Sequence, residues 1–287
     1  MVRLVSIAVA VTILGSLVVA QDAGRGARGG GLANKVPELA AGAFTASSTV
    51  ARTKFQHEWV DITLGGGKLH AWIEFPSGSG KAPVVIVMSH EAGLDDWMRA
   101  IADQLASHGF IAIAPDILSG RGPNRGNKDA FNFAADVIQA TAKLPQDEVI
   151  RRYKAAREYA TKLTRANGKT ASLGIGMGGA DSFQFAADVP DLDAAVVFYG
   201  TSPADSALAR IKAPVAGFYG EDDARVMPTV KRAEATMKRL GKTYDVHVYP
   251  GATQAFLRSQ AEGANGAATA AAWPAAIQFL QECLKGE

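Results

Sequence analysis

Cysteine and excess charge of one sign are both scarce in this chain. The 287 residues include a single cysteine, Cys283, so no internal disulfide can form. The 30 basic and 28 acidic residues leave a formal net charge of +2, which gives no electrostatic signature of nucleic-acid or anionic-membrane binding. Disorder is not indicated either, because 48% of the residues are hydrophobic and 20% are charged, as in a globular protein with a full core.

Sequence motifs for metals and cofactors are also missing. The chain has no HExxH motif, no pair of cysteines and no phosphate-binding loop of the form GxxxxGK followed by Ser or Thr. The acidic run at residues 221–223 would need His90 or Glu91 to complete a metal site, and adjacent acids more often form a solvated turn. We therefore expect neither a metal nor a cofactor.

The longest hydrophobic run lies at the start of the chain. After the basic Arg3, residues 4–19 are almost entirely apolar, and small residues precede Gln21. This pattern predicts a signal peptide over residues 1–20, cleaved after Ala20, and an exported protein, periplasmic or secreted, without membrane contact after cleavage. An uncleaved anchor is the alternative, because the run is just long enough to span a bilayer. Residues 21–54 are predicted to form a flexible Gly/Arg/Ala-rich linker and an irregular lead-in.

Residues 55–287 show the alternation of strands and helices that is typical of an α/β domain. A hairpin is predicted from two strands, 59–64 and 68–75. Six apolar segments that favour buried strands follow it, at 84–88, 110–114, 170–175, 194–199, 215–219 and 244–249. Helical patterns lie between them, at 94–107, 129–140, 146–165, 181–187, 229–240 and 267–284. Pro274 is expected to kink the last helix or to mark its start. The sequence therefore predicts one mostly parallel sheet of about eight strands, flanked by helices.

Residues that directly follow the predicted strands are the candidate site, since ligands bind at the carboxyl ends of strands in such sheets. Gly174, Gly176 and Gly178 lie at a strand-to-helix turn with the spacing of a nucleophile elbow, in which the central position carries the catalytic side chain. An acidic run ending in Asp223 and a segment containing Gln254 follow two later strands. This order, elbow then acid then a third group, is that of an α/β-hydrolase.

The sequence here resembles the dienelactone hydrolase family, an α/β-hydrolase group, over residues 59–284. The resemblance is carried by the segments VVIVMSHEAGL, GFIAIAPDILSGRGP, GIGMGG, YGEDDARVMP and YPGATQAFLR. It implies hydrolysis of lactones and esters by a Cys-His-Asp triad. It also implies a buried glutamate that helps to control the nucleophile, and arginines that hold a substrate carboxylate.

The resemblance assigns roles to five residues that match the family's pattern. Asp223 corresponds to the triad acid, and Glu91 corresponds to the glutamate near the nucleophile. The backbone N–H groups of Ala92 and Met177 fall where the oxyanion hole is formed. Arg258 corresponds to an arginine that binds the substrate carboxylate.

Two positions depart from the pattern, because Gly176 stands at the nucleophile position and Gln254 at the histidine position. A glycine cannot carry out covalent catalysis, although it adopts the positive-φ conformation of an elbow almost without cost. Gln254 is able to donate an N–H to Asp223, but it cannot accept and return a proton near neutral pH. The sequence thus predicts that the triad is degenerate.

Three functions are compatible with a degenerate triad. The one we favour is non-catalytic binding of a small carboxylate, ester or lactone in the former active site. The second is hydrolysis by a water that Glu91 or His90 activates, although His90 also suits a purely structural hydrogen bond. The third is a structural or interaction module. Whether Arg121 or Arg125 reaches the pocket is left open by the sequence.

Overall fold

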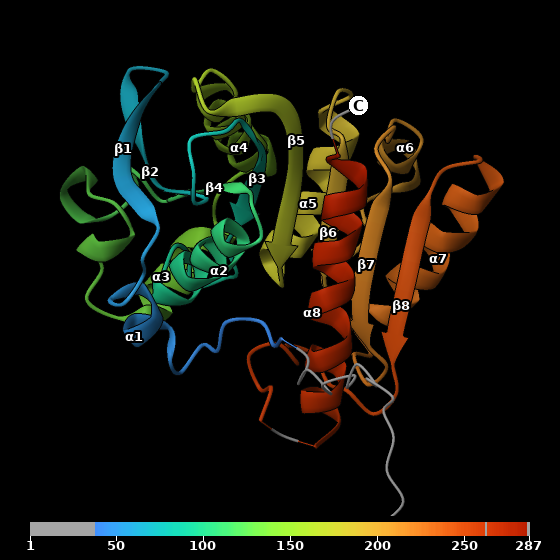
Figure 1. Cartoon of the computed structure of the whole chain (residues 1–287). Coiled ribbons are helices and arrows are strands. Elements are labelled where there is room, and N and C mark those ends of the chain that lie inside the picture. Colours follow the sequence, from blue (N-terminus) through green and yellow to red (C-terminus); the bar gives the residue numbers. More distant parts are fainter. Residues whose placement is uncertain (1–37, 262, 286–287) are drawn as a thin grey trace, which may run out of the picture. The chain divides into compact units, whose positions relative to one another are not determined.

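The computed structural model describes residues 38–261 and 263–285, which are built around an eight-stranded sheet (Figure 1). In sequence order the strands are β1 (Gln56–Leu64), β2 (Gly67–Phe75), β3 (Ala82–Met88), β4 (Ile111–Pro115), β5 (Ala166–Ile175), β6 (Ala194–Phe198), β7 (Val215–Gly220) and β8 (Tyr244–Tyr249). Their spatial order is β1-β2-β4-β3-β5-β6-β7-β8. Strand β2 pairs antiparallel with both of its neighbours, and every other pairing is parallel. The predicted mostly parallel sheet of about eight strands is confirmed.

Helices cover both faces of this sheet. They are α1 (Ala46–Val50), α2 (Asp96–Ser107), α3 (Ala134–Ala142), α4 (Gln146–Thr161), α5 (Met177–Asp188), α6 (Asp205–Leu208), α7 (Met227–Arg239) and α8 (Gly263–Cys283), with short 3-10 turns at Pro123–Arg125 and Lys128–Ala130. Helices α2 and α8 share one hydrophobic core, whereas α4, α5 and α7 share the core of the opposite face. None of the described helices is long and apolar enough to cross a membrane.

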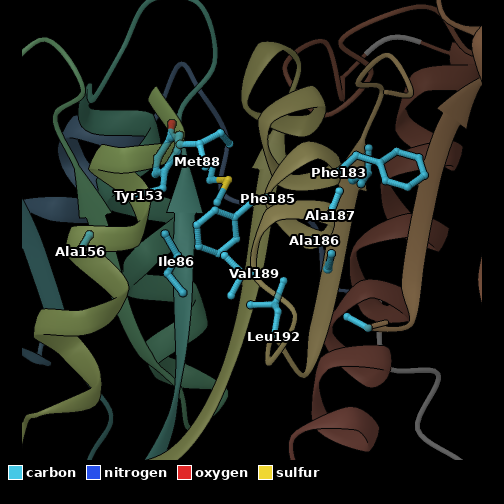
Figure 2. Packing of buried hydrophobic residues seen from close by; sticks show 14 of the residues in the cluster. Ile86, Met88, Tyr153, Ala156, Phe183, Phe185, Ala186, Ala187, Val189 and Leu192 are labelled. Atoms are coloured by element: carbon cyan, nitrogen blue, oxygen red, sulfur yellow. The ribbon is translucent and has the colours of Figure 1, made fainter. Parts of the chain in front are cut away.

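Strand β3 shows why an uninterrupted apolar run forms a central strand. Ile86 and Met88 point into the core with α4 and α5, while Val85 and Val87 point into the core with α2 and α8. Successive side chains of a strand point to opposite faces, so a strand covered on both sides has no place for polar residues. Figure 2 shows Ile86 and Met88 beside side chains of α4 and α5, including Tyr153.

Several element boundaries differ from the sequence prediction. Helix α3 begins at Ala134 and not near residue 129, because Phe133 has an extended backbone with φ of −130° and ψ of 139°. Helix α8 begins at Gly263 and continues through Pro274, so this proline does not mark its start. The long predicted helix at 146–165 ends at Thr161, and β5 begins four residues earlier than expected.

The predicted irregular lead-in is ordered where the structure describes it. Residues 38–50 run along α2 and contain the short helix α1, and the side chains of Ala40 and Ala46 are buried. The side chain of Gln104 anchors this segment by accepting a hydrogen bond from Ala41 N at 2.7 Å and donating one to the Leu39 carbonyl at 2.7 Å. The predicted signal peptide and the linker up to residue 37 lie outside the described residues.

One carboxyl group is buried between α4 and α5 without a cation. Asp181 is 3% exposed, and its Oδ1 accepts a hydrogen bond from Gln146 Nε2 at 2.9 Å. Its Oδ2 has no hydrogen-bond partner among the described residues. Burial raises the pKa of Asp181 to about 6, and the hydrogen bond from Gln146 opposes that rise. The ionised form therefore weakens the fold at neutral pH.

Asp181→Asn is expected to stabilise the protein above pH 6. Because the folded-state pKa is raised, the unfolded chain loses its proton first, and stability falls as the pH rises from about 4 to about 6. Asparagine cannot ionise, so the free energy of unfolding of the variant should not show this fall when it is measured by urea denaturation from pH 4 to pH 8. At pH 7 the variant should be more stable than the wild type by on the order of 1–3 kcal/mol. Glu282→Gln, at an exposed carboxyl group, is the control. Parallel pH profiles for wild type and Asp181→Asn would contradict the assignment.

Candidate active site

The turn between β5 and α5 has the backbone of a nucleophile elbow. Gly176 has φ of 61° and ψ of −114°, a conformation that side-chain-bearing residues adopt only under strain. Its neighbours are glycines for a different reason, which is space. A Cβ on Gly174 would lie 1.8 Å from the Gly178 carbonyl oxygen, and a Cβ on Gly178 would lie 2.1 Å from the Met88 carbonyl oxygen. The predicted elbow frame is therefore present without its nucleophile.

Space for a side chain exists at position 176. A Cβ built on Gly176 would lie 3.4 Å from Glu91 Oε2 and 3.8 Å from Tyr199 Cε2, both ordinary contact distances. The carboxylate of Glu91 thus stands beside the position where a nucleophile's side chain would begin, but it is exposed, whereas the resemblance implied a buried glutamate. The glycine is required by the backbone conformation and not by crowding.

Tyr199 is a site residue that the sequence analysis missed. It directly follows β6, has φ of 40°, and packs edge-on against Phe256 with ring centroids 5.3 Å apart. Burial raises its pKa well above the ordinary value, and the Glu91 carboxylate adds to this rise while Arg258 opposes it. Its hydroxyl is buried with no hydrogen-bond partner in the described part of the chain. The signal was available, because the end of the predicted strand 194–199 is a strand end like the others.

Asp223, the predicted triad acid, follows β7, but Gln254 at the predicted histidine position does not support it. Asp223 is buried after β7, and its Oδ1 accepts hydrogen bonds from the backbone N–H groups of Arg225 at 3.2 Å and Val226 at 3.1 Å. Its Oδ2 is buried and has no partner among the described residues. Gln254 is exposed, and it does not make the expected hydrogen bond to Asp223. That expectation is wrong, because the Gln254 side chain faces solvent and leaves the carboxylate oxygen unpaired.

His90 is held as a structural residue. It is 3% exposed, its Nε2 lies 3.0 Å from Asp95 Oδ2, and its Nδ1 lies 3.4 Å from Ala92 N. Burial acts to raise the pKa of Asp95, but the hydrogen bond from His90 and that from the Met98 N–H outweigh it and leave the pKa below its ordinary value. With both ring nitrogens engaged, His90 is poorly placed to activate a water or to contact a ligand.

The two predicted oxyanion donors differ in availability. Met177 is the first residue of α5, so its N–H has no acceptor within the helix and points out of the helix N-terminus. The Ala92 N–H makes only a long contact with the His90 ring. Met177 therefore retains a free donor suited to a carbonyl or carboxylate oxygen, whereas the Ala92 N–H is directed at His90 Nδ1. The acidic run before α7 forms a turn, in which Glu221 accepts from Gly251 N at 3.3 Å. Residues 38–261 and 263–285 contain no cluster of three or more metal-ligating side chains.

A cavity of about 350 Å³ adjoins this site and contains Arg258 in its wall. We call it the Arg258 cavity, and it is lined by Ala92, Asp95, Lys128, Asp129, Phe131, Asn132, Phe133, Ala134, Val137 and Arg258. The Arg258 guanidinium lies 5.9 Å from the Trp97 ring and has no ion-pair partner among the described residues. Arg121 pairs with Glu148 at 3.2 Å, and neither Arg121 nor Arg125 lines this cavity.

Comparison with known sequences points to one family. A sequence model of the dienelactone hydrolase family matches residues 69–284. The protein named "Putative carboxymethylenebutenolidase" from Saccharolobus solfataricus is 26% identical over 253 residues, which cover 77% of this chain and 96% of that protein. A probable 2-oxo-3-(5-oxofuran-2-ylidene)propanoate lactonase from Bradyrhizobium is 28% identical over 80% of this chain and 96% of its own length.

Solved structures agree with this result. A dienelactone hydrolase-like promiscuous phosphotriesterase from metagenomic libraries has a TM-score of 0.67 at 25% identity, covering 80% of this chain and 99% of its own. A dienelactone hydrolase from Anabaena variabilis has a TM-score of 0.62 at 20% identity, covering 81% of this chain and all of its own. These likenesses confirm the expected α/β-hydrolase fold.

Alanine substitutions should separate the two reasons for glycine in this turn. Gly176→Ala meets no close atom but must adopt φ of 61°, so we expect a folded protein that is less stable by about 1–2 kcal/mol in urea denaturation. Gly178→Ala places a Cβ against the Met88 carbonyl, so we expect no stably folded protein by circular dichroism. Equal stabilities of the two variants would contradict this division.

Proposed function

The chain belongs to the dienelactone hydrolase family, and on this premise we propose that it binds a small carboxylate, ester or lactone without cleaving it. In this proposal the site keeps its elbow backbone and the free N–H of Met177 but lacks the groups that form and release a covalent intermediate. Lactones and related esters are the expected class of ligand, because a relative 28% identical is named as a lactonase. The protein is a pseudoenzyme in this proposal.

The argument against covalent catalysis is chemical. Gly176 presents no atom that attacks a carbonyl carbon, and Gln254 is exposed and does not titrate near neutral pH. The unpaired Oδ2 of Asp223 marks the place where a histidine would have donated its ring N–H. Because that oxygen is buried, leaving it unpaired costs stability.

Arg258 is the single observation that carries the binding proposal. Its guanidinium has no ion-pair partner among the described residues and lines the Arg258 cavity with Lys128. Lys128 itself is paired with Asp129 at 3.1 Å, so Arg258 is the cation available to an incoming anion. A guanidinium presents a planar fork of N–H donors that matches a carboxylate, and such charge-assisted hydrogen bonds are strong.

Hydrolysis without a nucleophile is the second candidate function. Glu91 favours it, because its carboxylate lies beside the empty position at Gly176 and is exposed to water. A water held there by Glu91 would face the free N–H of Met177, which is suited to stabilise the developing oxyanion. His90 does not favour it, since both of its ring nitrogens are engaged.

Export of the protein is part of the proposal. The supporting observation is the sequence of residues 1–20, with its basic start, apolar run and small residues before Gln21. N-terminal sequencing of the purified protein should find a chain that begins at Gln21. A chain that begins at Met1 would favour the membrane anchor.

Restoring the triad should separate binding from the second candidate function. We expect no measurable turnover of an activated aryl ester or a dienelactone by the wild type. In Gly176→Cys/Gln254→His we expect a rate on the order of 100-fold above the uncatalysed reaction, from general acid–base catalysis and a thiol nucleophile. Glu91→Gln in the wild-type background is the control. Wild-type turnover that Glu91→Gln abolishes would instead establish the water mechanism. Turnover by neither wild type nor a folded double variant would contradict the view that the catalytic frame is intact.

Removal of Arg258 should abolish carboxylate binding. Butyrate and benzoate are expected to raise the melting temperature of the wild type, because a ligand that binds only the folded state stabilises it. In Arg258→Ala the dissociation constant should rise by about tenfold or more, since one charge-assisted hydrogen-bond pair is lost. Arg239→Ala, at an exposed arginine of α7, is the matched control and should behave like the wild type. An unchanged affinity in Arg258→Ala would sink the proposal.

A further inference from the structure

We propose that residues 38–50 add a second, apolar subsite beside Arg258, so that the ligand is a carboxylate with an apolar tail. The inference rests on the proposed function, because it takes Arg258 as the group that holds the carboxylate. The family match begins at residue 69, so this segment lies outside the matched part of the chain. It nevertheless packs against the site and not against a remote face.

Hydrogen bonds attach the segment to both walls of the site. The Trp97 indole donates to the Ala41 carbonyl at 2.7 Å, and the same ring lies 5.9 Å from the Arg258 guanidinium. Gln260, two residues after Arg258, donates through Nε2 to the Ala40 carbonyl at 3.2 Å. The segment therefore has a defined position relative to Arg258.

A second cavity of about 260 Å³ lies between residues 42–45 and residues 258–261, and we call it the Phe44 cavity. Arg258 lines both this cavity and the Arg258 cavity, so the two cavities adjoin the same residue. Phe44 is 86% exposed although it belongs to the wall. Covering a water-exposed phenyl ring with an apolar group is favourable, because it removes apolar surface from water.

The charges around the Phe44 cavity select the ligand chemistry. Its other lining residues are Gly42, Ala43, Phe44, Thr45, Ser259, Gln260 and Ala261, none of which is charged. A cavity whose single charged lining residue is Arg258 matches a ligand that carries one anionic group and is otherwise apolar. A cavity of this volume is at the small end for a complete ligand site, which suits a subsite for the tail.

Chain-length dependence of binding tests the subsite. Butyrate and octanoate are titrated by calorimetry into the wild type, Phe44→Ala and Ala261→Trp, where the tryptophan fills the cavity from its opposite wall. Each buried methylene contributes about fourfold in affinity, so partial burial of the tail should make octanoate bind at least about tenfold more tightly than butyrate. Both variants should reduce this ratio by about threefold or more and leave butyrate binding unchanged. Leu240→Ala, at an exposed apolar residue outside both cavities, is the control.

The outcomes distinguish the subsite from the proposed function. Equal affinities for the two acids in the wild type, or an undiminished ratio in both Phe44→Ala and Ala261→Trp, would overturn the subsite alone, provided that butyrate binding depends on Arg258. The proposed function, and the subsite with it, would be overturned if neither acid bound the wild type. They would also be overturned if Arg258→Ala bound both acids as tightly as the wild type does.

Discussion

The close approach of α5 to the sheet is the constraint on which the site depends. A Cβ on Gly178 would meet the Met88 carbonyl, and a Cβ on Gly179 would lie 2.6 Å from the Phe198 carbonyl oxygen. Without side chains there, the first turn of α5 rests directly on the ends of β3 and β6. This contact holds Gly176 in its elbow conformation and presents the Met177 N–H at the carboxyl edge of the sheet. This arrangement does not require a side chain at position 176, because it depends on glycines.

The remaining polar groups of the site share one property, which is the lack of a partner. Asp223 Oδ2 and the Tyr199 hydroxyl are buried and unpaired among the described residues, and Arg258 forms no ion pair with any of those residues. Unpaired buried groups weaken a fold, so their presence together is typical of a site arranged for something other than stability. In a triad enzyme the first would hold a histidine. The positive charge of Arg258 is the observation that supports the proposed recognition of an anion.

Most of the fold was predictable from the sequence, and much less of the site was. Buried parallel strands are apolar on both faces, so β3 and its neighbours stand out as short hydrophobic runs. The side chain of Gln254, which the resemblance places at the histidine position, was wrongly expected to reach Asp223, since spacing along the chain does not determine a rotamer. Tyr199 was missed because its strand end carried no recognised motif. Residues 38–50 were read as irregular because their contacts with α2 are all long-range.

The sequence by itself determined the α/β topology and the glycine spacing of the turn before α5, because these follow from local periodicity and from the identity of single residues. Only the tertiary structure decided which groups meet. It placed Glu91 beside the empty elbow position and engaged both nitrogens of His90, and it located Arg258 between two cavities built from segments far apart in the chain. Such encounters depend on how strands and helices pack, and packing is a property of the whole chain that no local pattern encodes.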